Sequence, residues 1–74
     1  MLSERDHRIL AFEGAHRGHS AAKEEAIRRE LGMTAPRYYQ LLGRLLDEPD
    51  ALAADPLLVG ALRRNRERSR TAAS

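Results

Sequence analysis

The sequence predicts an all-α fold, a small helix-turn-helix domain of three to four helices with a basic C-terminal helical extension. Alanine, leucine, arginine and glutamate dominate the 74 residues, and the β-branched residues that favour strands are scarce. Serine or threonine precedes each of the first three helix-length segments, as expected of N-caps. A chain of this length has enough apolar surface for one core only. We therefore expect one domain over residues 1–62 and a basic arm over residues 63–74, helical in part and fraying.

The first helix is predicted to begin after Ser3, with Asp6 completing a capping box three residues later. Gly14 is expected to end the helix or to begin its end, and residues 14–20 are the connecting loop. Its predicted inward face consists of Ile9, Leu10 and Phe12.

The second helix is predicted over residues 21–31, with Ser20 as its N-cap. Gly32 follows it, at the position where a left-handed C-terminal turn favours a residue without a Cβ atom. The side chains expected to face the core are Ala22, Ala26, Ile27 and Leu31.

The third helix is predicted over residues 35–46. Thr34 is its expected N-cap, and Pro36 lies in the first turn, where a missing N–H costs little. Apolar residues then recur at the spacing of a single buried stripe, namely Tyr38, Leu41, Leu42 and Leu45.

Residues 47–50, Asp-Glu-Pro-Asp, interrupt the helical pattern, and a short helical turn is expected at residues 51–54. Asp55 and Pro56 then open the last helix as a cap followed by a proline. Its expected inward face consists of Leu57, Leu58, Ala61 and Leu62. Helix-forming residues continue beyond Leu62 without apolar partners, so this helix is expected to extend past the core.

Only Gly32, Met33 and Thr34 separate the second helix from the third, which is the spacing of a helix-turn-helix. Ile27, Leu31 and Met33 provide the apolar residues expected around such a turn. Arg28 stands where this motif usually has a small alanine. The usual helix crossing therefore requires the arginine stem to lie along the surface.

A third helix placed in the major groove of DNA would contact bases with the face opposite its buried stripe. Arginine binds guanine and glutamine binds adenine through paired hydrogen bonds. A tyrosine donates to phosphate, and Gly43 would allow close approach to a backbone. The residues of this region predicted to contact DNA are Thr34, Pro36, Arg37, Tyr39, Gln40 and Arg44. The alternative is that these polar side chains only solvate an exposed face.

Charge is divided unevenly along the chain. From Gly60 onward five arginines and one glutamate give +4, whereas eight basic and ten acidic residues give −2 before it. This imbalance favours an arm that binds a polyanion, through phosphates or a flanking minor groove. The arginines predicted to do so are Arg63, Arg64, Arg66, Arg68 and Arg70. The alternative is a solvated helix end whose arginines complement the helix dipole.

Other function classes have little support. His16 and His19 form an H-x-x-H pair without the further ligands that zinc requires, so we expect no metal and no cofactor. Asp47, Glu48 and Asp50 are interpreted as capping residues, and no enzyme is expected. The absence of cysteine, of a membrane-length apolar run and of a signal-like start favours a cytoplasmic protein without membrane contact.

Several segments resemble a family of short actinobacterial proteins of unknown function with a helix-turn-helix-like core. They are Ile9, Phe12 with Glu13, and residues 22–28, 37–42, 51–59 and 62–64. The similarity covers about residues 3–64. It implies the same fold and a regulatory DNA-binding role.

These observations predict a DNA-binding transcriptional regulator that contacts the major groove of double-stranded DNA with residues 35–46. The alternative is a protein-interaction module, such as an adaptor on RNA polymerase or another regulator, without sequence-specific DNA binding. In that case Arg37, Tyr39 and Arg44 would be anchor residues, since tyrosine and arginine are enriched at hot spots. A domain this small also suggests a homodimer, for which the last helix is a candidate interface, and the alternative is a monomer.

Overall fold

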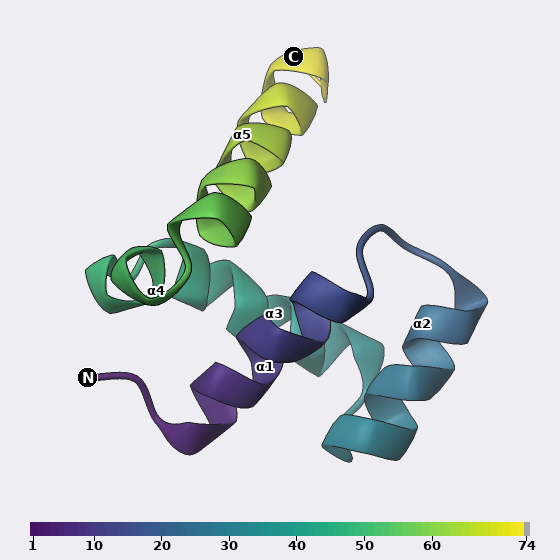
Figure 1. Ribbon diagram of the computed structural model, residues 1–74. Coiled ribbons are helices and arrows are strands. Elements are labelled where there is room, and N and C mark those ends of the chain that lie inside the picture. Colours follow the sequence, from purple (N-terminus) through teal and green to yellow (C-terminus); the bar gives the residue numbers. More distant parts are fainter. Residues whose placement is uncertain (74) are drawn as a thin grey trace.

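The computed structural model describes the backbone of residues 1–73 and the side chains of residues 1–69, and this part contains helices and no strand (Figure 1). The all-α prediction is therefore confirmed. The elements are α1 (Glu4–Ala15), α2 (Ala21–Ala26), the π-helical η1 (Ile27–Leu31), α3 (Ala35–Leu46), α4 (Pro49–Ala54) and α5 (Pro56–Ala73).

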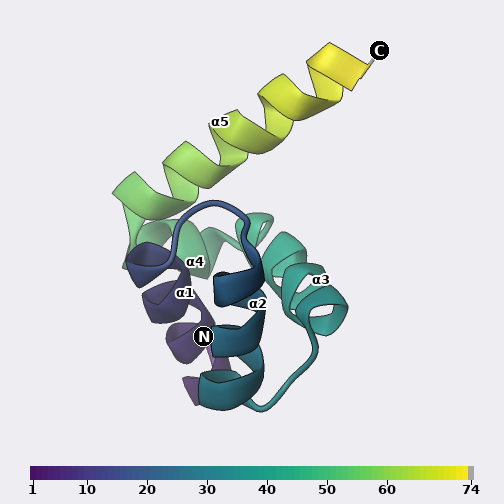
Figure 2. The ribbon, with the colours of Figure 1, turned by 90° about the vertical axis from the view of Figure 1, so that its right-hand side faces the viewer.

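Helix α3 is the central element, because α1, η1, α4 and α5 all pack against it. Figures 1 and 2 show its first turn near η1 and its last turn near α4 and the start of α5. The four residues predicted for its inward stripe are all buried, and Leu46 joins them. From α1, Ile9, Leu10 and Phe12 complete the core as predicted.

Helix α1 begins as predicted. The Ser3 hydroxyl accepts from the N–H of Asp6, and the Asp6 carboxylate accepts from the N–H of Ser3, both at 3.1 Å. The helix ends at Ala15, one residue after Gly14. Gly14 keeps a helical backbone, and a Cβ atom there would lie 3.8 Å from Leu58 of α5. The glycine with a positive φ in this region is Gly18, at 88°.

The second helical segment begins at its predicted cap, where the Ser20 hydroxyl accepts from the N–H of Lys23. It ends as predicted before Gly32, whose φ is 66°, but its last turn is π-helical. The prediction that Ala22 faces the core is wrong, and Lys23 is buried instead. Ala26 and Ile27 are buried, and Lys23 precedes them by three and by four residues. Helical spacing therefore places Lys23 on the same inward face as these two residues.

Helix α4 begins at Pro49, earlier than the expected turn at residues 51–54. The Asp55 carboxylate accepts from the N–H of Leu58 and so caps α5 as predicted. The placement of Leu57 in the core is wrong, because 86% of it is exposed, whereas Val59 is fully buried. Leu58, Val59 and the half-buried Leu62 share the face of α5 that contacts the core. Leu57 lies about 200° from Val59 around the helix, on the opposite side from this fully buried residue.

The second half of α5 projects away from the other helices (Figures 1 and 2). A helix that extends past the core was expected here from the sequence. This second half is continuous with the first half, because α5 is a single helix over Pro56–Ala73. The described residues extend over 33 × 30 × 18 Å.

Candidate nucleic-acid interface

The outward face of α3 carries the polar side chains that the sequence placed there. Pro36, Arg37, Gln40 and Arg44 are exposed, on the side opposite the buried stripe. Thr34 precedes them at the helix start, and its hydroxyl accepts from the N–H of Arg37 at 3.4 Å. The helical repeat therefore produces one solvent-facing row, which we call the α3 outer face and define as Pro36, Arg37, Gln40 and Arg44.

Two side chains of the α3 outer face are already paired. Arg37 Nη1 donates to Gln40 Oε1 at 2.8 Å. The Gln40 amide oxygen has a second lone pair, and its NH₂ group makes no hydrogen bond with a described residue. Gln40 can therefore still donate and accept along one edge of an adenine while Arg37 remains beside it. The Arg44 side chain makes no hydrogen bond or ion pair within residues 1–69.

Tyr39 lies at the border of this face and is half-buried. Its hydroxyl is 3.0 Å from His19 Nδ1, and its ring meets that of Tyr38 edge to face at a centroid distance of 5.1 Å. The hydroxyl expected to donate to a phosphate is thus engaged with the loop before α2. Tyr39 lies between the exposed face of α3 and the core.

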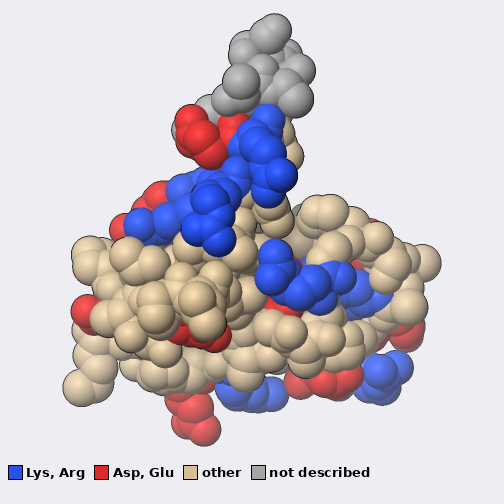
Figure 3. Space-filling view, turned by 45° about the horizontal axis from the view of Figure 1, so that its top comes forward, with Lys and Arg blue, Asp and Glu red and all other residues tan. Residues whose placement is uncertain are grey.

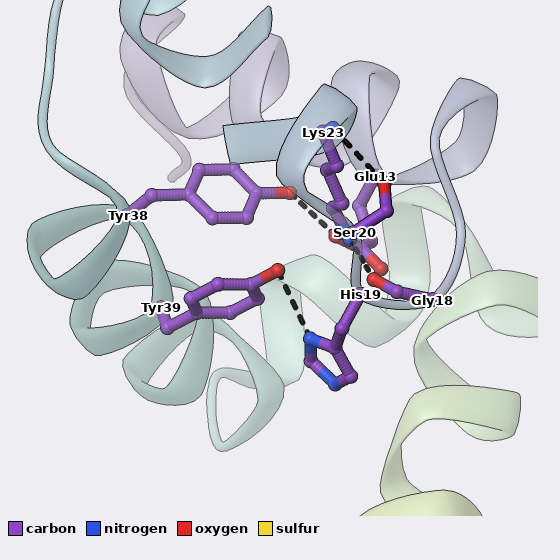
Figure 4. Close-up of polar contacts among 7 residues, drawn as sticks. All are labelled: Glu13, Gly18, His19, Ser20, Lys23, Tyr38 and Tyr39. Atoms are coloured by element: carbon purple, nitrogen blue, oxygen red, sulfur yellow. Dashed lines mark hydrogen bonds and ion pairs between the residues drawn. The ribbon is translucent and has the colours of Figure 1, made fainter. Parts of the chain in front are cut away.

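Beneath Tyr39 lies a buried polar network that the sequence reasoning missed (Figure 4). Lys23 and Glu13 form an ion pair at 2.8 Å, although only 4% and 3% of these residues are exposed. The Tyr38 hydroxyl donates to the same Glu13 oxygen at 2.5 Å, and Lys23 also donates to the carbonyl oxygen of Gly18 at 2.7 Å. One network therefore connects α1, α2, α3 and the loop between α1 and α2.

All members of this network have partners, and no buried side-chain nitrogen or oxygen in the described part of the chain lacks one. Burial raises the pKa of the Tyr38 hydroxyl above its ordinary value, and its hydrogen bond to Glu13 raises it further. Tyr38 therefore stays protonated and donates. Because this bond requires Tyr38 to point inward, it sets the rotation of α3 about its own axis. The α3 outer face then points to solvent.

A sequence signal for this network existed in the spacing of Lys23. Three and four residues separate it from Ala26 and Ile27, so it belongs to their inward face. A lysine at such a position requires an anionic partner, since an isolated buried charge is too costly. The identity of that partner does not follow from the spacing, because it is the packing of α1 against α3 that brings Glu13 to Lys23.

The arginines of α5 fall into two groups. Arg63 Nε donates to the carbonyl oxygen of Leu46, and Arg66 Nη2 is 2.9 Å from Asp47 Oδ1. These two arginines attach α5 to the end of α3. Arg64 and Arg68 are exposed. The side chain of Arg70 lies outside the described residues.

The two histidines of the H-x-x-H pair have different neighbours. His16 stacks on Phe12 at a centroid distance of 4.3 Å, and its Nε2 is 4.0 Å from Glu30. His19 contacts Tyr39, as described above. In the described part of the chain, no three histidine, cysteine, aspartate or glutamate residues are grouped as a metal site requires.

Comparison with known proteins identifies the family of the chain. A family described as "Protein of unknown function (DUF3263)" matches residues 1–73, so the chain belongs to it. Comparisons with curated proteins and with solved structures found no match. No helix in the described residues is both long and apolar enough to cross a membrane.

Proposed function

We propose that this member of the DUF3263 family is a DNA-binding transcriptional regulator that inserts α3 into the major groove of double-stranded DNA. The observation that carries the proposal is the α3 outer face, where two arginines and a glutamine are exposed opposite a fully buried Tyr38. An exposed row of these residue types on a rigid helix matches the hydrogen-bonding pattern of base edges.

The connection between the second and third helical segments supports a helix-turn-helix. Three residues join η1 to α3, and the first of them, Gly32, has the left-handed conformation that allows a tight turn. Met33 and Leu31 pack against the core beside this turn. Arg28 is exposed, so it does not crowd the crossing of the two helices.

The chemistry of the α3 outer face suits direct base contacts. Arg37 and Arg44 each offer paired donors for the O6 and N7 atoms of guanine. Gln40 offers one donor and one acceptor for adenine. Arg64 and Arg68 of α5 supply positive charge for phosphates, which position a protein without specifying sequence. In this function the chain is not an enzyme, and it acts in the compartment that contains the chromosome.

The test is selection of bound sequences from a random pool of duplex DNA at two salt concentrations. We expect an enriched motif at both concentrations, with weaker total binding at the higher one. Arg37→Ala should weaken or alter the motif. Arg28→Ala is the matched control, because it removes an exposed arginine from η1 and should leave the motif intact.

Two results would contradict the proposal. Binding without any motif would indicate a protein that contacts the DNA backbone alone. The absence of binding would favour the protein-interaction alternative, in which the same arginines contact an RNA polymerase or another regulator.

A further inference from the structure

A cleft of about 430 Å³ lies between α3 and α5. Residues 17–19, in the loop before α2, form one side of it, and Asn65, Arg66 and Ser69 of α5 form another. Figure 3 shows basic side chains both on α5 and on the part of the body that α5 overhangs. The cleft borders the α3 outer face but is not part of it.

The floor of the cleft is apolar. Leu42 and Leu46 of α3 and Leu62 of α5 contribute to it. Gly43 lies among them, and a Cβ atom placed on Gly43 would have no neighbour within 4 Å. The backbone of α3 is therefore exposed to the cleft at Gly43, where any larger residue would occupy part of the space.

The rim of the cleft is basic. The Arg17 side chain is exposed and makes no hydrogen bond or ion pair with a described residue. Arg66 contacts Asp47 through Nη2, and its other guanidinium donors remain available. Glu13 is the one acidic residue among the described residues that line the cleft, and its charge is neutralised by the buried Lys23. The cleft therefore presents one unpaired guanidinium, that of Arg17, and one shared with Asp47, that of Arg66, beside apolar surface.

We propose that this cleft binds a small organic anion, a carboxylate or sulfonate attached to an apolar acyl or aromatic body. Its volume lies in the range of small-molecule sites, about 300–1,000 Å³. The anionic group would lie between Arg17 and Arg66, because guanidinium groups bind such oxyanions through paired hydrogen bonds. The apolar body would cover Leu42, Leu46 and Leu62. This proposal does not depend on DNA binding.

The probe for the test is 1-anilinonaphthalene-8-sulfonate, whose fluorescence rises in apolar surroundings. We expect saturable binding of one probe per chain. N-phenyl-1-naphthylamine has the same rings without the sulfonate, and it should bind less tightly. Arg17→Gln should weaken sulfonate binding by about tenfold, the equivalent of one charged hydrogen bond. Arg28→Gln makes the same charge change away from the cleft and should have no effect.

Gly43→Leu separates binding from folding. Leucine is the better helix former, and the position has open space, so the melting temperature should stay the same or rise. The leucine side chain would fill the floor of the cleft, and probe binding should fall by more than about tenfold, beyond the loss of a single contact. Gly43→Ala adds one methyl group and should retain most of the binding.

Three results would overturn the proposal. The first is probe binding that is absent, or that is unchanged in Gly43→Leu. The second is equal affinity for the two naphthylamines, which would remove the requirement for an anion. The third is a wild-type dimer in sedimentation that Gly43→Leu converts to a monomer, which would make the cleft an interface between two copies of the chain.

Discussion

At the scale of single residues, the ion pair between Lys23 and Glu13 is the most unusual feature. Lys23 is the only lysine in the chain, and among the lysine and arginine side chains of residues 1–69 it is the buried one. Its compact ammonium group donates to Glu13 and to the Gly18 carbonyl and lies 5.4 Å from the Tyr39 ring centroid. A planar guanidinium has a different shape and donor arrangement. The network therefore favours lysine at this position.

Removal of the lysine charge should destabilise the fold strongly. Lys23→Met leaves the buried Glu13 carboxylate without its cation, and breaking a buried pair in this way costs about 3–5 kcal/mol. The free energy of unfolding from urea denaturation measures the loss. Arg28→Met, which removes an exposed charge, should change it by less than about 0.5 kcal/mol. Comparable effects of the two substitutions would mean that the ion pair has no structural role.

Tyr38→Phe tests the hydrogen bond to Glu13 and its dependence on pH. At neutral pH the loss of a bond to a charged acceptor should cost about 2 kcal/mol. The folded pKa of Tyr38 is raised above 10.0, so in alkali the unfolded chain loses this proton first. The contribution of Tyr38 to the free energy of unfolding is therefore fully present below pH 10, and it declines as the pH rises further.

Melting temperatures between pH 8 and pH 11 provide the measurement for Tyr38. The wild type should lose stability above about pH 10 more steeply than Tyr38→Phe, because the variant lacks this proton. Parallel curves for the two proteins would show that Tyr38 ionises equally in the folded and unfolded chains.

At the scale of elements, the sequence predicted helix starts better than helix faces. The caps Ser3, Ser20, Thr34 and Asp55 all act as expected, because an N-cap depends on residues within one turn. The inward face of a short amphipathic helix depends on its partners as well. Ala22 and Leu57 were misplaced for this reason, and the π-turn of η1 has no short-range signal in its sequence.

Helix α5 offers a matched pair of neighbouring arginines. Arg63→Met removes the donor to the Leu46 carbonyl and should lower the free energy of unfolding by about 1 kcal/mol. Arg64→Met makes the same change at an exposed side chain and should have almost no effect. Thermal unfolding of both variants distinguishes the two roles. A larger loss in Arg64→Met would show that α5 is attached to α3 through its other face.

At the scale of the whole molecule, the two faces of α3 have different surroundings. Its inner face packs against α1, η1, α4 and α5, and its outer face is exposed. The outer face was predictable from sequence, because one helical repeat determines both faces together. The engagement of Tyr39, Arg63 and Arg66 was not predictable. Their partners, His19, Leu46 and Asp47, meet them only through the packing of the helices.

The measurement that tests the central claim most directly is sequence discrimination by α3. It is the ratio of affinities for a selected duplex and for a shuffled duplex of the same composition. Gln40→Ala should leave the melting temperature almost unchanged, since Gln40 is exposed. It should reduce discrimination by about 1–3 kcal/mol, the value of one paired base contact. Arg28→Ala should leave the ratio as it is. An unchanged ratio in Gln40→Ala, Arg37→Ala and Arg44→Ala alike would contradict the placement of α3 in the major groove.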